Sequence, residues 1–350
     1  MMGASYYTLR PLIPRWLQVL ARRRVAARLL RKNHSCWPIC GSAGALPPDW
    51  QGWPGGKRFA LVLTHDVELQ SGALRCEELA DLEESRGFRS AFGFVPLRYR
   101  TPDQLRDGLV NRGFEIMVHD LYHDGKLYRN WRTFAKRSAA INAFLQDWGT
   151  RGFCSGAMHH NLPWISQLNI DYGASTYDVD PFEPQACGVG RIFPYWVQPP
   201  DGEGRGFVEM PYTLPQDFTL FALLEEKSNA IWRRKLDWIA GKGGMALIKT
   251  HPDYMAFRSE DKRMERYPVE LYTDLLDYIR SHYEGEYWLA QPSEMARFWR
   301  GLRPAEKSSA NNIAAAVTLC ASCKRAHAEG WLSQYPRNTV TGTCQRPTTP

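Results

Sequence analysis

The sequence predicts an α/β protein built as a distorted parallel barrel of strands and helices. Three observations carry this prediction. Apolar runs of strand length alternate with helical patterns, polar clusters follow several of these runs, and 350 residues suit one barrel with added tails. The chain is 44% hydrophobic and 23% charged, as in folded proteins. We expect no integral membrane protein, because no stretch approaches the ~18 apolar residues of a membrane-spanning helix.

The first predicted barrel elements follow one another from residue 59. A continuous apolar run over 59–64 is typical of a strand buried on both faces. The pattern then predicts, in order, a helix over 74–86, a strand over 91–95, a helix over 103–112 and a strand over 114–118.

The next helix has the clearest pattern in the chain. Phe134, Ile141 and Leu145 recur at helical spacing, with Ser138 and Trp148 in the same row. The remaining predicted elements are strands at 152–154, 172–175, 207–210 and 245–250, and helices around 232–239 and 271–279. Strands that alternate with helices in this way form a parallel sheet, and this length favours a barrel over an open sheet.

The two ends of the chain differ from the barrel in composition. Residues 1–48 hold eight of the 44 lysines and arginines and no acid, so 36 bases and 37 acids remain for the rest. The net charge of +7 therefore comes from this segment, and we expect no specific nucleic-acid partner. Segment 1–48 is expected to be helical, either on an anionic membrane surface or packed on its own domain.

Domain boundaries follow from composition. Residues 49–57 are rich in Gly and Pro and predict a linker, which places the barrel at 58–303. Residues 304–350 predict a poorly ordered tail. This tail contains Cys320, Cys323, His327 and Cys344, which could form a small zinc site. Its composition favours the alternative, an incidental thiol pair. Eight scattered cysteines suit a reducing compartment. We expect a cytoplasmic protein, with peripheral contact at the inner membrane surface as an option.

Polar clusters follow four predicted strands, at the end where a parallel barrel builds its active site. They are Thr-His-Asp-Val-Glu at 64–68, His-Asp-Leu-Tyr-His-Asp-Gly at 119–125, Ser-Thr-Tyr-Asp-Val-Asp at 175–180 and Thr-His-Pro-Asp at 250–253. His119 and His123 are the strongest candidate metal ligands, because their spacing puts two imidazoles on one face of a helical turn. The alternative is a histidine that only hydrogen bonds a loop.

The ordered clusters resemble the polysaccharide deacetylase family, also called the NodB-homology family or carbohydrate esterase family 4. The resemblance runs from about residue 58 to residue 255. Residues 64–68 are similar to a variant of the family's first motif, Thr-Phe-Asp-Asp-Gly, and 119–123 to its paired metal histidines. Residues 152–156 fall where the Arg-x-Pro motif belongs, and His251 stands where the family keeps its general-acid histidine.

This resemblance implies a metal-dependent hydrolase of amide C–N bonds that removes N-acetyl groups from a polysaccharide, such as an exopolysaccharide, or from a glycan precursor. One divalent ion, with zinc expected, would bind at His119 and His123, with Asp66 or Glu68 as the carboxylate or with water in place of a carboxylate. Asp66 would be the general base and His251 the general acid. Candidate substrate contacts, with core or rim packing as the alternative for the tryptophan, are Tyr177, Asp178, Asp180 and Trp196.

Two positions depart from the family pattern. Val67 stands where the family places a metal-binding carboxylate. Glu68 suits that role. It lies two residues after Asp66, and side chains two apart on an extended segment point the same way. Cys154 stands where the family has the arginine that orients the catalytic aspartate, so we expect a raised pKa and a looser orientation for Asp66. The alternatives to a deacetylase are a non-catalytic carbohydrate-binding relative and a hydrolase of another non-peptide C–N bond.

Overall fold

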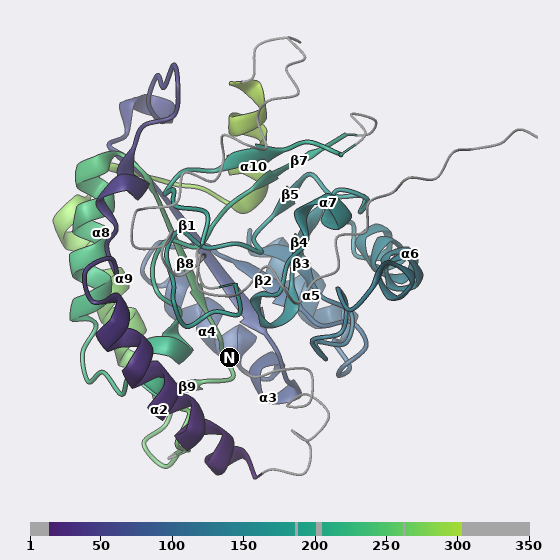
Figure 1. Ribbon diagram of the computed structural model, residues 1–350, viewed down its shortest axis with the longest axis horizontal. Coiled ribbons are helices and arrows are strands. Elements are labelled where there is room, and N and C mark those ends of the chain that lie inside the picture. Colours follow the sequence, from purple (N-terminus) through teal and green to yellow (C-terminus); the bar gives the residue numbers. More distant parts are fainter. Residues whose placement is uncertain (1–13, 186–187, 201–204, 262, 303–350) are drawn as a thin grey trace, which may run out of the picture.

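The computed structural model describes residues 14–185, 188–200, 205–261 and 263–302. A curled, mostly parallel sheet lies at its centre, with helices around it (Figure 1). Its strands are β1 (Phe59–Val67), β2 (Ala91–Phe94), β3 (Glu115–His119), β4 (Gly152–Cys154), β5 (Tyr172–Gly173), β6 (Tyr195–Val197), β7 (Phe207–Glu209), β8 (Met245–Thr250) and β11 (Tyr287–Leu289). The predicted distorted parallel barrel is confirmed.

The central strand of the sheet is β1. The order is β11-β1-β2-β3-β4-β5-β7-β6, and β8 also pairs with β1. All nine residues of β1 are buried, in line with its continuous apolar run. Thr64 lies opposite Ala91 on β2 and Lys249 on β8, and this register brings the ends of the three strands together.

Irregular backbone joins the two ends of the curled sheet. The amide groups of Thr213 and Leu214, which follow β7, donate to the Leu247 carbonyl on β8 at 3.0 and 3.2 Å. Among the described pairs of the sheet, β6 runs antiparallel to β7 and the others are parallel. The barrel is therefore distorted at this seam.

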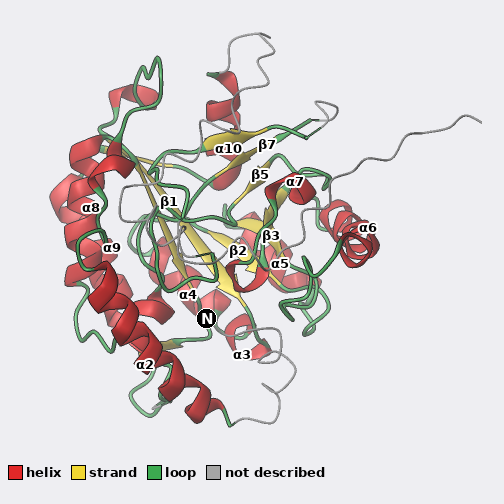
Figure 2. Ribbon diagram, in the orientation of Figure 1, coloured by secondary structure: helices red, strands yellow, loops and turns green. Residues whose placement is uncertain are grey.

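Helices cover the outside of the sheet (Figure 2). They are α3 (Gln70–Ala73), α4 (Cys76–Glu84), α5 (Asp103–Asn111), α6 (Trp131–Asp147), α7 (Leu162–Ile165), α8 (Ala230–Lys242), α9 (Glu270–Tyr283) and α10 (Pro292–Gly301). The Asn130 side chain caps α6 by accepting the Thr133 amide hydrogen at 2.8 Å. The row that predicted α6 buries Phe134, Ile141 and Leu145.

Several short elements had no sequence prediction. They include β6, β11, α7, α10, the paired segments β9 (Met255–Ala256) and β10 (Tyr267–Pro268), and the π-helix η5 (Phe218–Leu223). A strand of two or three residues is too short to show an alternating pattern. The predicted helix over 74–86 begins earlier and divides into α3 and α4.

The N-terminal segment packs on the barrel through helix α2 (Arg15–Asn33). Val19 and Ala26 are buried, and Arg23 donates to the Ala222 carbonyl in η5 at 2.9 Å and pairs with Glu225 at 2.7 Å. No helix in the described part of the chain combines the length and the apolar character that crossing a membrane requires.

The Gly/Pro-rich segment 49–57 also packs on the barrel. Trp53 is buried, its Nε1 donates to the Gly243 carbonyl at 2.8 Å, and its ring stacks on Phe193. The segment is therefore held in place by its tryptophan. The predicted tail, 304–350, lies outside the described residues together with its cysteines and His327.

Candidate active site

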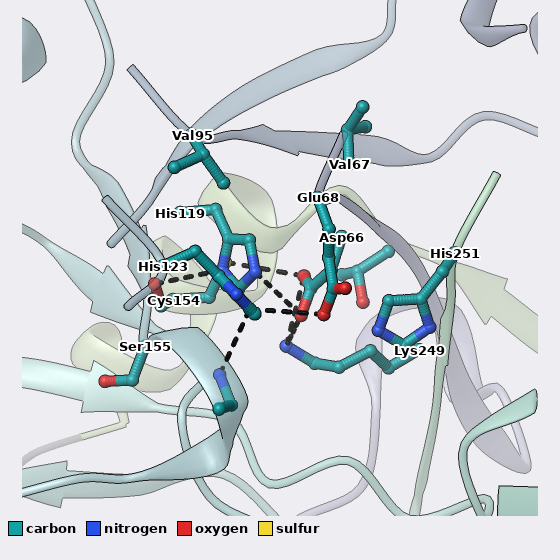
Figure 3. A network of polar contacts seen from close by, with 12 residues as sticks. Asp66, Val67, Glu68, Val95, His119, His123, Cys154, Ser155, Lys249 and His251 are labelled. Atoms are coloured by element: carbon teal, nitrogen blue, oxygen red, sulfur yellow. Dashed lines mark hydrogen bonds and ion pairs between the residues drawn. The ribbon is translucent and has the colours of Figure 1, made fainter. Parts of the chain in front are cut away.

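The ends of β1, β3, β4 and β8 bring most of the predicted site residues together. Asp66 and Glu68 come from β1 and the residue after it, His119 ends β3, Cys154 ends β4 and His251 follows β8 (Figure 3). Parallel strands end at one edge of the sheet, so clusters far apart in sequence meet there.

The loop after β3 holds the paired histidines. The two imidazole centres lie 4.9 Å apart. The helical turn predicted for 119–123 was wrong: this segment is irregular, and Asp120 and His123 have φ values of 56° and 51°. Asp and His enter this left-handed region more readily than most residues. The rings meet because the loop turns sharply.

His119 has the environment of a metal-binding histidine. Its side chain is buried, and its Nδ1 lies 3.3 Å from the Cys154 carbonyl oxygen and 3.1 Å from the Cys154 sulfur. With Nδ1–H donating to the carbonyl, Nε2 carries the lone pair. That Nε2 is buried and has no hydrogen-bond partner among the described residues. It is the kind of orphaned atom that a cation would satisfy.

Glu68 and His123 complete a set of ligand atoms with His119. Glu68 Oε1 lies 3.1 Å from His123 Nε2, and Glu68 Oε2 accepts the Tyr254 hydroxyl hydrogen at 2.8 Å. Ligand atoms of Glu68, His119 and His123 all lie within 4.8 Å of one another, as do those of Asp66, His119 and Cys154. Val67 points away from the histidines (Figure 3). The first set contains both predicted histidines and a carboxylate.

Asp66 is held by Lys249, which the sequence analysis missed. Lys249 Nζ donates to Asp66 Oδ2 at 3.0 Å and Oδ1 at 3.3 Å, and the Cys154 thiol donates to Oδ1 at 3.4 Å. The expected rise in the pKa of Asp66 was wrong. Burial does raise this pKa, but the cationic groups around the carboxylate, including Lys249 in direct contact, outweigh burial and lower it well below the usual range. A lysine inside an otherwise apolar strand was the available signal, because a buried charge needs a partner.

His251 is paired with Asp217, another residue that the sequence analysis missed. His251 Nδ1 lies 2.7 Å from Asp217 Oδ1, while Asp217 Oδ2 accepts the His251 amide and the Tyr267 hydroxyl at 2.8 and 3.0 Å. Burial lowers the pKa of His251, but the Asp217 carboxylate outweighs it and raises that pKa to about 9. His251 is therefore an imidazolium at neutral pH.

Three of the four candidate substrate contacts are buried and hydrogen bonded to other residues. Tyr177 and Asp178 are fully buried, and Asp178 pairs with the buried Lys235 at 2.7 Å. Asp180 Oδ2 accepts the Tyr212 hydroxyl at 2.9 Å. Trp196, half-buried on β6, has a guanidinium over its ring, that of Arg300 at 5.8 Å. Their contact with a substrate stays a prediction.

Comparison with known proteins defines the class of fold. No protein-family model and no curated protein sequence matches the chain. Among solved structures, a Mycobacterium smegmatis protein assigned as a polysaccharide deacetylase matches with a TM-score of 0.56 and 16% identity, over 74% of this chain and 96% of that one. A Pseudomonas aeruginosa PAO1 protein with the same assignment gives 0.56 and 17%, over 73% and 95%.

Puue allantoinase matches with a TM-score of 0.58 and 15% identity, over 77% of this chain and 99% of that one. Identities this low show a shared fold. The chain thus has the fold of the polysaccharide deacetylases, which confirms the resemblance at the level of the fold.

Proposed function

We propose that the chain is a metal-dependent hydrolase that removes N-acetyl groups from a polysaccharide or a glycan precursor, such as a bacterial surface polysaccharide or exopolysaccharide. The observation that carries this proposal is the convergence of three side chains that could ligate a metal ion, a buried carboxylate and an imidazolium at one edge of the sheet. Amide hydrolysis needs a group that removes a proton from water and another that protonates the leaving nitrogen.

Glu68, His119 and His123 would hold one divalent ion, for which two imidazoles and a carboxylate favour zinc. The orphaned Nε2 of His119 and the contact of its Nδ1 with a carbonyl oxygen support this donor set. When bound, such an ion lowers the pKa of a water molecule and polarises the amide carbonyl.

Asp66 and His251 would carry the two proton transfers. Asp66, in the ionised form beside Lys249, accepts a proton from the attacking water. His251, as the imidazolium that Asp217 stabilises, donates its proton to the nitrogen of the breaking C–N bond. The products are acetate and a free amine.

Hydrolysis of another non-peptide C–N bond is the second candidate. The fold is shared with an allantoinase as well as with proteins assigned as deacetylases. The cation beside Asp66 also comes from β8, so the surroundings of the proposed base differ from the family pattern. A non-catalytic carbohydrate-binding protein is the third candidate, and assays of turnover separate it from the other two.

The first test is acetate release from N-acetylated oligosaccharides by protein loaded with zinc or cobalt. We expect turnover by the wild type and a loss of about 10²- to 10⁴-fold in Asp66→Asn, the usual contribution of a general base. Hydrolysis of cyclic amides or ureides without acetate release would favour the second candidate. Glycan binding without any turnover would leave the non-catalytic protein.

We further propose that the protein is cytoplasmic and that α2 contacts the inner membrane surface. The outward row of α2 begins with Leu17 and Leu20 and continues with Arg24, Arg28 and Arg31, all exposed. These three arginines have no acidic partner among the described residues, and the helix contains no acid. Apolar side chains followed by cations suit an anionic lipid surface.

This contact predicts binding to vesicles that contain anionic lipid. Replacing Arg24, Arg28 and Arg31 with Gln should lower the affinity for such vesicles, measured by co-sedimentation, roughly 100-fold. Each arginine near the membrane surface contributes about 1 kcal/mol of binding free energy. A matched control replaces three exposed arginines on other elements: Arg129 and Arg132 near the start of α6 and Arg234 on α8. Equal losses in both variants, or equal binding to neutral vesicles, would contradict the assignment to α2.

A further inference from the structure

Lys249 places a positive charge in the centre of the candidate active site. It lies on β8 two residues before His251, so both side chains point to the same side of the strand. Its Nζ donates to both oxygens of Asp66 and, at 3.0 Å, to the Ala174 carbonyl. An ammonium group has three hydrogens, and these three oxygens are available to them. The ammonium is therefore fixed in position.

The two contacts to Asp66 orient its carboxylate. Asp66 is buried, and a buried carboxylate needs a charge or hydrogen bonds to compensate for lost hydration. With Lys249 bound to both oxygens, Asp66 Oδ2 lies 3.8 Å from Nε2 of His119. The ammonium thus turns one oxygen of the proposed base toward the proposed metal ligands.

Cys154 contacts the same carboxylate from β4. Its thiol donates to Asp66 Oδ1 at 3.4 Å, and a thiol that donates a hydrogen bond keeps its proton and is neutral. Position 154 is where the resemblance leads one to expect the orienting arginine. The chain thus has a neutral group on β4 and a cation on β8, both within reach of one carboxylate.

We propose that Lys249 on β8 supplies the cation that positions Asp66. It does so in place of an arginine at position 154 on β4, where this chain has Cys154. Lys249 is then a positioning residue of the reaction. The proposal rests on the proposed function for its kinetic consequences. The pairing itself rests on the contacts of Lys249 and Cys154 with Asp66.

The side chains around Asp66 are closely packed. Gly93 on β2 faces the same spot, and even a Cβ there would lie 3.0 Å from the Cys154 sulfur and 3.6 Å from Asp66 Oδ1. An arginine at position 154 would bring its charge to the carboxylate that Lys249 already contacts. Two buried cations beside one carboxylate repel each other, so we expect either cation alone to serve and both together to fail.

The test is a double-mutant cycle on the full-length, metal-loaded protein. Lys249→Met is expected to lower kcat for acetate release by about 10²- to 10³-fold, the usual effect of losing one charge-stabilising donor, with KM nearly unchanged. Cys154→Arg alone should also lower kcat. The double variant Cys154→Arg/Lys249→Met should recover at least about tenfold over Lys249→Met, because it restores one cation.

Cobalt binding provides the control. Lys249 donates to Asp66 and Ala174 and makes no hydrogen bond to Glu68, His119 or His123 in the described part of the chain. A folded Lys249→Met protein should therefore bind Co²⁺ with an affinity no more than about threefold below that of wild type. If Lys249→Met fails to fold, Lys249→Gln takes its place, because it keeps a donor and removes the charge. Unchanged kcat in a folded variant, or no recovery in a folded double variant that binds cobalt, would overturn the proposal.

The same cycle separates this proposal from the proposed function. If the wild type releases no acetate from any substrate, the proposed function fails while the pairing is still measurable by urea unfolding. We then expect the double variant to have a higher free energy of unfolding than the sum of the two single effects predicts. Lys249→Met leaves Asp66 with no cation and Cys154→Arg leaves it with two, whereas the double variant leaves it with one. Strict additivity would overturn the pairing as well.

Discussion

Replacing His119 and His123 together with alanine is expected to reduce bound zinc from about one equivalent to less than about a tenth. The two imidazoles supply two of the three proposed ligands, and a carboxylate alone holds zinc weakly. Acetate release should fall by at least about 10³-fold, since the ion both activates water and polarises the carbonyl. The measurement is metal analysis of the purified proteins after loading and dialysis, together with acetate release.

Glu68→Gln and Asp66→Asn then separate the ligand from the base. Glu68 belongs to the set of ligand atoms with both histidines, so its replacement should lower zinc affinity by at least about tenfold. Asp66 is held by Lys249 and Cys154, so Asp66→Asn should keep zinc and lose turnover. The reverse pattern, with zinc lost from Asp66→Asn and kept by Glu68→Gln, would assign the metal carboxylate to Asp66.

Two kinds of sequence signal predicted the fold and the positions of most candidate site residues. Continuous apolar runs marked β1 and β8, because strands buried on both faces have nearly uniform composition. Polar residues directly after such runs marked the site, because parallel strands end at one edge of the sheet. Neither signal depends on which strands are neighbours, and both are therefore visible in a single sequence.

What the sequence could not show depends on contacts between distant segments. Lys249 is 183 positions from the Asp66 carboxylate that it contacts, and Asp217 is 34 positions from the His251 ring. Register between β1 and β8 makes the first contact, and the irregular segment before η5 makes the second. The expectation of a raised pKa for Asp66 failed for this reason. The cation was present in the sequence, but its partner was set by strand pairing.

The loop that holds the two histidines shows the same limit on a smaller scale. Spacing alone suggested a helical turn, and the prediction that the rings lie close together was correct even though the turn was not. The positive φ values of Asp120 and His123 arise from a loop that must turn at the edge of the sheet. Short elements such as β6 and β11 escaped prediction because two or three residues carry no period.

The activity of the metal-loaded wild-type protein should fall as the pH rises, at or below about pH 9, because His251 must be protonated to donate a proton and its pKa is about 9 before an ion is bound. Burial lowers the pKa of His251, and the carboxylates around it raise that pKa. These are Asp217, Glu68 and Asp66, with Glu183 and Asp253 also facing its charge. Below the pKa of His251 the imidazolium dominates, and above it the neutral imidazole has no proton to give.

Asp217→Asn should move this descending limb to lower pH by about 1 to 3 units, the usual effect of removing an adjacent opposite charge. A bound dication lowers the pKa of His251 in both proteins, so the difference between them isolates Asp217. Tyr267→Phe is the matched control, because it removes another hydrogen bond to Asp217 and leaves the charge in place. The descending limb of the pH–activity curve of Tyr267→Phe should stay near that of wild type. If Asp217→Asn and wild type lose activity at the same pH, the titrating acid is a group other than the His251–Asp217 pair.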